Sequence, residues 1–345
     1  MFHPQNPLGL NGIGFIEFVS PSPESLHQLF LALGFSLTKT HGRKAIDLYS
    51  QGDICFLLNR QPEGHGAGFR KLHGPGVSAM GWRVRDSRIA AAVAASRFPG
   101  GVVEGDYTAG EAAVPAVRGI GGSLIYLPDE MITPGDLGFI DHPDPVMVEP
   151  AGFTGIDHLT NNVYAGDLGA WSDFYKDIFG FTEVRSFSIR GESTGLKSWA
   201  LRSPCGSFCI PINEGTEEKS QINEYLKDYN GPGVQHIALT TPDIVGSIRC
   251  LHGNGIGTLD IDSEYYETVF DRVPGVTEDR SRLQKAGILV DGDEEGYLLQ
   301  IFTRNVIGPI FFEVIQRKNH HSFGEGNFGA LFRSIERDQE QRGVL

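Results

Sequence analysis

The chain has few of the residues and segments that would place it in a specialised structural class. Only 4 cysteines occur among its 345 residues, too few for the disulfide framework of a small secreted domain. No apolar run approaches the roughly 20 residues that span a bilayer. The first residues also lack the basic and apolar regions of a signal peptide. We therefore expect a protein that does not cross a membrane and that works in a reducing, cytoplasmic setting.

Basic residues are scarce relative to acidic ones. The 29 Lys and Arg residues face 43 Asp and Glu residues, giving a formal net charge of −14. This balance argues against nucleic acid or an anionic membrane surface as a main partner. A hydrophobic content of 40% is sufficient for a packed core and excludes disorder as the main state. At roughly 150 residues per domain, the length predicts two domains.

Two pairs of similar segments indicate that the second half of the chain repeats the first. Residues 12–17 (GIGFIE) resemble residues 155–160 (GIDHLT), and residues 74–79 (GPGVSA) resemble residues 231–236 (GPGVQH). Each segment reads as a strand that leads into a helical pattern, and short β-type runs follow. The sequence therefore predicts an α+β fold of four βαβββ modules, arranged as two pseudo-repeated halves whose curved sheets form open barrels.

The two halves are expected to meet in residues 141–152, where prolines and acids interrupt any regular pattern. We therefore expect an N-terminal domain over residues 1–150 and a C-terminal domain over residues 151–345.

The C-terminus carries a helical pattern behind a glycine-rich turn. Asn327 is expected to cap a helix whose polar face, residues 336–338, meets water. This helix either docks on the domain or closes over a pocket, and the two roles are compatible. Its apolar stripe consists of Phe328, Leu331, Phe332 and Ile335.

Two histidines of the second half stand at positions that the repeat makes equivalent to apolar residues of the first half. His158 stands where the first half has Phe15, and His236 where it has Ala79. A lone histidine in an apolar strand is usually a core residue. Two at symmetry-related positions of one curved sheet are instead expected to converge inside its cavity.

Glu313 is a third candidate, because it lies in the otherwise apolar run 310–315. An ionised acid is rarely buried without a partner, so it either faces a cation or pairs with a basic residue such as Arg317 or Lys318. Two imidazoles and one carboxylate form the facial triad of non-haem Fe(II) oxygenases, which leaves coordination positions open. Zinc and manganese are not excluded by these ligand types.

Six short segments carry a resemblance to a known family: 156–160 (IDHLT), 211–214 (PINE), 233–236 (GVQH), 298–302 (LLQIF), 312–317 (FEVIQR) and 323–328 (FGEGNF). With these segments in this order, the chain resembles the 4-hydroxyphenylpyruvate dioxygenases of the vicinal-oxygen-chelate superfamily, and the bacterial members in particular. The resemblance extends from about Asn6 to the C-terminus.

The resemblance implies that His158, His236 and Glu313 hold one Fe(II) per chain. Because the first half has Phe15 and Ala79 at the ligand positions, we expect it to hold no metal and to serve as a scaffold for oligomerisation. It implies the small-molecule substrates 4-hydroxyphenylpyruvate and O2, and the products homogentisate and CO2, in tyrosine catabolism. The implied reaction combines decarboxylation, ring hydroxylation and migration of the side chain. We also expect a homo-oligomer, either a dimer or a tetramer.

The resemblance also implies a set of polar pocket residues. Ser198, Asn213 and Gln221 match positions around the substrate ring, and amides suit a phenol because they both donate and accept hydrogen bonds. Gln235 and Gln300 match positions near the metal-bound oxoacid and oxygen. Strand alternation would point Gln235 away from its neighbour His236, so its role requires a twist or a bulge.

The aromatic pocket positions follow from the same resemblance. Phe328 is expected to stack on the substrate ring, and Pro211 to shape the approach to it. Phe302 and Phe311 are either pocket walls or ordinary core residues, and Ser198 and Gln221 are alternatively exposed to solvent. The apolar pocket positions are Pro211, Phe302, Phe311, Phe323 and Phe328, and Asn327 lies beside the last of them.

Two alternative functions remain open from the sequence. Hydroxymandelate synthase resembles this family, shares its substrate and iron triad, and has a smaller aliphatic residue at the position of Phe302. A phenylalanine there favours attack on the ring. A binding protein without chemistry would be expected to lose at least one metal ligand, and all three are present.

Overall fold

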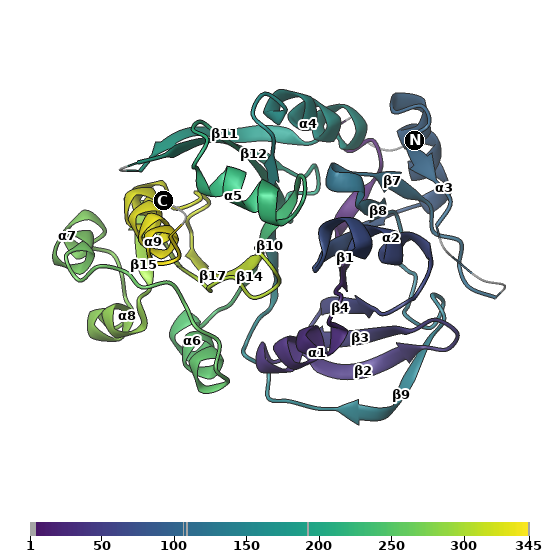
Figure 1. Ribbon diagram of the computed structural model, residues 1–345, viewed down its shortest axis with the longest axis horizontal. Coiled ribbons are helices and arrows are strands. Elements are labelled where there is room, and N and C mark those ends of the chain that lie inside the picture. The colour runs from purple at the N-terminus through teal and green to yellow at the C-terminus, as the bar shows by residue number, and fades with distance from the viewer. Residues whose placement is uncertain (1–4, 106, 108–109, 192, 344–345) are drawn as a thin grey trace.

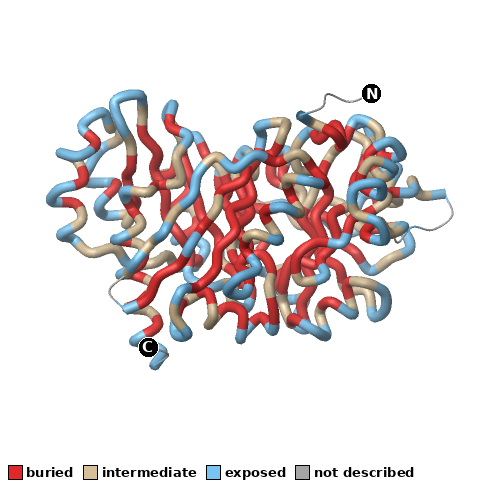
Figure 2. Tube along the Cα trace, turned by 90° about the horizontal axis from the view of Figure 1, so that it is seen from above, coloured by how far each residue is buried: buried red, intermediate tan, exposed pale blue. Residues whose placement is uncertain are grey.

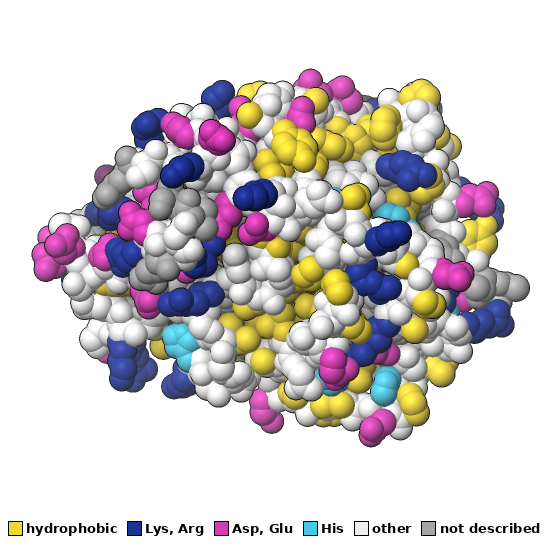
Figure 3. Space-filling view, viewed as in Figure 1, with side chains coloured by type: hydrophobic (Ala, Val, Ile, Leu, Met, Phe, Trp, Pro, Cys, Tyr) yellow, Lys and Arg dark blue, Asp and Glu magenta, His cyan; other side chains and the backbone are white. Residues whose placement is uncertain are grey.

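The computed structural model describes residues 5–105, 107, 110–191 and 193–343, and it contains two curved sheets side by side (Figure 1). None of the helices in this part of the chain has the length and apolar character needed to span a bilayer. Acidic and basic side chains are interspersed over the face drawn in Figure 3.

The two sheets confirm the predicted repeat, because their strands follow the same order. The first sheet is ordered β6-β7-β8-β5-β1-β4-β3-β2-β9, and the second β15-β16-β17-β14-β10-β13-β12-β11. The first comprises β1 (Leu10–Val19), β2 (Ser36–His41), β3 (Ile46–Gln51), β4 (Ile54–Asn59), β5 (Gly76–Val84), β6 (Val102–Val103), β7 (Ala116–Arg118), β8 (Leu124–Tyr126) and β9 (Phe139–Val146). The second comprises β10 (Gly155–Val163), β11 (Thr182–Arg190), β12 (Gly195–Arg202), β13 (Cys209–Gly215), β14 (Gly233–Thr240), β15 (Leu289–Gly292), β16 (Tyr297–Phe302) and β17 (Phe311–Lys318).

The helices begin and end where the local sequence favours it. The carboxylates of Asp86 and Asp243 cap α3 and α6 by accepting the backbone N–H three residues ahead, each at 2.9 Å. Gly34 and Gly180 adopt the left-handed backbone expected after a helix, with φ of +83° and +80°. The helices are α1 (Pro23–Ala32), α2 (Gly64–His73), α3 (Ser87–Arg97), α4 (Leu168–Phe174), α5 (Gln221–Asp228), α6 (Ile244–Gly253), α7 (Tyr265–Arg272), α8 (Arg280–Ala286) and α9 (Phe328–Gln341).

The prediction that residues 141–152 are irregular is wrong for residues 141–146. Residues 139–146 form β9, which pairs only with β2 at the edge of the first sheet. The ladder shifts register between the pairs Lys39–Asp141 and Leu37–Val146, and Pro143 and Pro145 fall within this irregularity. Proline is tolerated there because an edge strand needs no hydrogen-bond donor on its outer side.

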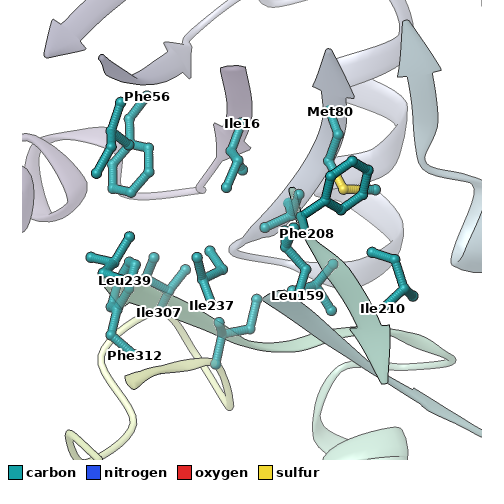
Figure 4. Close-up of a cluster of buried hydrophobic side chains, with 14 of the residues drawn as sticks. Ile16, Phe56, Met80, Leu159, Phe208, Ile210, Ile237, Leu239, Ile307 and Phe312 are labelled. Atoms are coloured by element: carbon teal, nitrogen blue, oxygen red, sulfur yellow. The ribbon is translucent and has the colours of Figure 1, made fainter. Parts of the chain in front are cut away.

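A shared hydrophobic core joins the two sheets. Ile16 and Met80 of the first half pack toward Ile237 of the second, as Figure 4 shows. The rings of Phe56 and Phe312 stack across the junction with their centroids 6.1 Å apart. Buried segments run through both halves, with exposed turns at the rim (Figure 2). The convex faces of the sheets thus hold the halves together, and the concave faces remain available for cavities.

Helix α9 lies in the curve of the second sheet, beside β15 (Figure 1). Two expectations about it are wrong. Asn327 stands at the helix start, but its fully buried side chain caps no backbone N–H and instead accepts from the Tyr265 hydroxyl at 2.6 Å. Glu336 does not face water, because its carboxylate accepts from the backbone N–H of Ser193 and Thr194. The helix is therefore anchored by buried polar contacts as well as by its apolar stripe.

Candidate metal centre

The three predicted ligands converge inside the second sheet. The Glu313 Oε2 atom lies 3.1 Å from His158 Nε2 and 3.5 Å from His236 Nε2. The two Nε2 atoms are 3.3 Å apart. Neighbouring ligands bonded at about 2.1 Å to one ion stand roughly 3.0–3.4 Å apart, so the three atoms surround a point suited to a metal ion. Glu313 does not pair with Arg317, which binds Asp157 instead.

A β-bulge beside each histidine explains why adjacent residues serve the same site. The ladder between β10 and β14 shifts register between Ile156 and His158, and again between Thr160 and Asn161. The first shift leaves Asp157 of β10 without a partner in the ladder. The second leaves Gln235 of β14 without one. A bulge re-aims side chains that regular alternation would send to opposite faces. The bulge that the role of Gln235 requires is therefore present.

These bulges let each histidine bond to the residue before it. His158 Nδ1 lies 2.8 Å from Asp157 Oδ1, and His236 Nδ1 lies 2.9 Å from Gln235 Oε1. Because Asp157 and Gln235 offer oxygen acceptors, each Nδ1 carries a proton, and in the neutral form of each ring the lone pair of Nε2 is directed at the common point. This is the tautomer that a metal ligand requires.

In the metal-free centre, the buried Glu313 carboxylate is balanced by a proton on His158. Burial acts to raise the pKa of Glu313, but His158 and His236 lower it to about 2. Burial acts to lower the pKa of His158, but Glu313 and Asp157 raise it to about 9. The pKa of His236 is lowered by its burial. Without metal, a proton on His158 therefore faces the Glu313 carboxylate, and a bound metal ion would replace that proton.

Asp157 is in turn held by Arg317. The Arg317 guanidinium donates to both carboxylate oxygens, from Nε at 2.7 Å and from Nη2 at 2.8 Å. Its Nη1 donates to the backbone oxygens of His320 at 3.0 Å and Ser322 at 2.6 Å. One side chain thus connects the residue that orients His158 to the segment that leads into α9.

The metal centre opens into a cavity of about 90 Å³ under α9. Ser198 is only 6% exposed, so it does not point into open solvent, and the half-buried Gln221 lines the same cavity. Phe302 and Phe311 line it as well, and the Phe311 ring stacks on His236 at 4.8 Å. The predicted residues that line the cavity are Ser198, Pro211, Asn213, Gln221, Gln235, Gln300, Phe302, Phe311, Phe323 and Phe328.

Asn327 lies behind this lining. Its Nδ2 donates to Gln300 Oε1 at 3.4 Å, and its Oδ1 also accepts from Arg272 at 3.3 Å. Gly324, with φ of +80°, lies so close to Gln300 that a Cβ atom would meet the amide oxygen at 1.8 Å. Asn327 therefore orients Gln300 and the start of α9.

The roles of three residues at the site were not predicted from the sequence. Thr160 Oγ1 lies 2.9 Å from His236 Nε2, and the Phe187 ring contacts Phe328 with centroids 5.1 Å apart. Arg317 was considered only as a partner of Glu313. Thr160 could have been found from its place in the segment IDHLT, two residues after His158 on the same face of the strand.

Comparison with known proteins identifies relatives over the full chain. A family model for the N-terminal part of hydroxyphenylpyruvate dioxygenase matches residues 4–141. A model for the glyoxalase, bleomycin resistance protein and dioxygenase superfamily matches residues 155–300. Protein MelA of Shewanella colwelliana is 54% identical over 99% of both chains. A 4-hydroxyphenylpyruvate dioxygenase of Pseudomonas aeruginosa is 46% identical over 99% of this chain and 97% of its own.

A solved structure shares the fold. It is a fusion of a xylose isomerase-like TIM barrel with a 4-hydroxyphenylpyruvate dioxygenase, and it superposes with a TM-score of 0.82 at 31% identity. The match covers 98% of this chain and 54% of the fusion protein.

Proposed function

The chain belongs to the 4-hydroxyphenylpyruvate dioxygenase family, and we propose that it converts 4-hydroxyphenylpyruvate and O2 to homogentisate and CO2 in tyrosine catabolism, with one Fe(II) per chain. The observation that carries the proposal is the convergence of His158 Nε2, His236 Nε2 and Glu313 Oε2 at one side of a cavity lined by aromatic side chains and several amides. Three protein ligands leave room on the metal for two substrates.

A ferrous ion held by these three atoms supplies the redox chemistry with dioxygen. The protein residues act on the organic substrate. Gln235 and Gln300, which line the same cavity, orient the oxoacid end. Ser198, Asn213 and Gln221 contact the phenol end, where amides and a hydroxyl serve a group that donates and accepts. Holding both ends fixes which ring carbon faces the metal.

The aromatic residues of the terminal segment close the cavity. The Phe323 ring lies 5.7 Å from that of His158, and Phe187 contacts both Phe323 and Phe328. With Phe328 stacked on the substrate ring, this wall excludes water from the reacting groups, which protects reactive intermediates from side reactions. Movement of α9 away from β11 and β15 would open the cavity for exchange of substrate and product.

The two halves have different proposed roles. Residues 151–345 form the catalytic domain, and residues 1–150 serve as a scaffold that supports a homo-oligomer. The exposed side chains of Ile140 and Met147, 55% and 71% accessible, lie at or beside the edge strand β9 and support association there. Light scattering on the purified protein measures the assembly.

A cytoplasmic location is supported by the free cysteines of the described residues.

Anaerobic reconstitution tests the function. The metal-free protein is loaded with Fe(II), then given 4-hydroxyphenylpyruvate and O2, and the product is identified by mass and NMR. Homogentisate with one CO2 per O2 is expected. Hydroxymandelate as the product would assign the benzylic reaction instead, and an absence of iron-dependent oxygen uptake would leave a binding protein.

A further inference from the structure

The side-chain amide of Gln300 can face the catalytic cavity with either its oxygen or its nitrogen, and its neighbours determine which. Gln300 is only 2% exposed and lines the cavity. Its Oε1 accepts from Asn327 Nδ2 at 3.4 Å. Among the residues that the structure describes, none accepts a hydrogen bond from Gln300 Nε2. The N–H groups of Gln300 are therefore left for a ligand in the cavity.

The orientation of the Asn327 amide follows from Arg272 on α7. A guanidinium carries only donors, and Arg272 Nη2 lies 3.3 Å from one end of the amide, so that end must be the oxygen. The Asn327 nitrogen therefore faces Gln300. Because an amide nitrogen only donates, Gln300 must offer its oxygen in return. One guanidinium thus fixes the direction of two buried amides in succession.

The second neighbour of the Asn327 oxygen does not make this choice. The Tyr265 hydroxyl donates to Asn327 Oδ1 at 2.6 Å and accepts from the Val290 N–H at 2.7 Å. Burial raises the pKa of Tyr265, so its hydroxyl stays protonated. A hydroxyl can donate or accept, and Tyr265 would suit either direction of the amide. Arg272 suits only one.

Arg272 is itself held in place where α7 packs on β15, beside α9 (Figure 1). Its Nη1 donates to Asp291 Oδ1 at 2.8 Å, and its Nη2 donates to the Val290 carbonyl at 2.9 Å. The other oxygen of Asp291 accepts from the Gly326 N–H at 3.0 Å. A Cβ atom on Gly326 would overlap the Arg272 guanidinium. The glycine therefore lets the terminal segment close onto this ion pair.

The direction of the Gln300 amide matters for an anionic oxoacid. The carboxylate and keto oxygens of such a substrate only accept hydrogen bonds, and a bond from N–H to a charged oxygen is stronger than one between neutral groups. A reversed amide would instead place its oxygen against the anion. Arg272 acts from outside the cavity, because its side chain is 38% exposed and does not belong to the lining.

We propose that Arg272 is a positioning residue that acts through Asn327 and keeps the N–H groups of Gln300 directed at the oxoacid end of the substrate. This inference rests on the proposed function, because it requires that the cavity receive a 2-oxoacid.

Calorimetric titration of the anaerobic Fe(II)-loaded protein with 4-hydroxyphenylpyruvate tests the inference without turnover. Arg272→Met removes the donors, so that both amides can turn. We expect binding to be about tenfold weaker, the effect of losing one hydrogen bond to a charged group. Arg272→Lys keeps a group that only donates and should bind more tightly than Arg272→Met. Fe(II) affinity, measured separately with a chelator, should be the same in all three proteins.

Two further variants separate the direction of the amide from the general docking of α9. Arg337→Met is the matched control, because Arg337 is 39% exposed and pairs α9 with Asp262 without touching either amide; it should leave binding unchanged. Asn327→Asp keeps an oxygen for Arg272 but has no donor for Gln300. Its carboxylate should draw the Gln300 N–H groups out of the cavity and weaken binding about tenfold or more.

Three results would overturn the inference: unchanged binding by Arg272→Met, unchanged binding by Asn327→Asp, or equal losses in Arg272→Met and Arg337→Met. If Arg272→Met does not fold, Asn327→Asp decides the question. A wild type that binds 4-hydroxyphenylpyruvate but forms no homogentisate would contradict the proposed function alone. A wild type that does not bind this oxoacid would contradict both.

Discussion

Arg317 and Asp157, 160 residues apart in the chain, form a two-point ion pair in which both carboxylate oxygens accept from one guanidinium. Asp157 also accepts from His158 Nδ1, and the remaining Arg317 donors reach the segment before Phe323. The pair therefore fixes a metal ligand and the start of the cavity wall at the same time.

Replacing Asp157 by asparagine should weaken metal binding. Asparagine keeps the shape but removes the charge that makes His158 a stronger ligand, and loss of such an orienting partner typically reduces metal affinity about 10- to 100-fold. Competition with a chromophoric chelator measures the affinity for Fe(II) under anaerobic conditions. The control is Asp260→Asn, which removes an exposed carboxylate paired with Arg304. Equal affinities for the wild type and Asp157→Asn would show that the charge of Asp157 has no such role.

Replacing Arg317 by lysine should loosen the terminal segment. Lysine keeps the positive charge but cannot contact Asp157 twice and also reach the carbonyls of His320 and Ser322. We expect faster tryptic cleavage at the arginines of α9 and a higher KM, with a smaller change in kcat. Arg304→Lys, at an exposed pair, is the matched control. If Arg317→Lys is cleaved at the same rate as the wild type, Arg317 does not hold the terminal segment closed over the cavity.

Phe302→Ile should divert the reaction toward hydroxymandelate. The Phe302 ring lies 6.3 Å from His236 and 6.1 Å from Phe311, so it stands beside the metal and limits which substrate carbon approaches. A smaller side chain opens space for the benzylic carbon. Product ratios by chromatography measure the effect, with Phe332→Ile, a change in the same cavity on α9, as a control. If the variant yields homogentisate alone, Phe302 does not determine which substrate carbon is hydroxylated.

Metal affinity should rise with pH. In the metal-free protein the pKa of His158 is raised to about 9 by Glu313 and Asp157 against the effect of burial, so below that pH the metal must displace a proton. Affinity for Co(II) should therefore fall by about tenfold per unit as pH decreases from roughly 8.5 to 6.5, with one proton released per metal. Titrations in buffers of different ionisation enthalpy count the protons. A metal affinity independent of pH would contradict the presence of a proton on His158 in the metal-free centre.

The repeat and the three ligands could be predicted from sequence, because the pair GPGVSA and GPGVQH places Ala79 and His236 at equivalent points of two strands. The bulges at Asp157 and Gln235 could not, since a bulge depends on how one strand pairs with another rather than on local preference. The burial of Glu336 and Asn327 could not be predicted either, for the same reason. Their polar partners lie 142 and 62 residues away, so local helix patterns carry no sign of their burial.

Anomalous diffraction at the iron edge from crystals of the Fe(II)-loaded protein examines the centre itself. The account predicts one peak per chain, bonded to His158 Nε2, His236 Nε2 and Glu313 Oε2, with every other contact made by water or substrate. A peak at another place, or a fourth protein ligand that fills the open side, would contradict it.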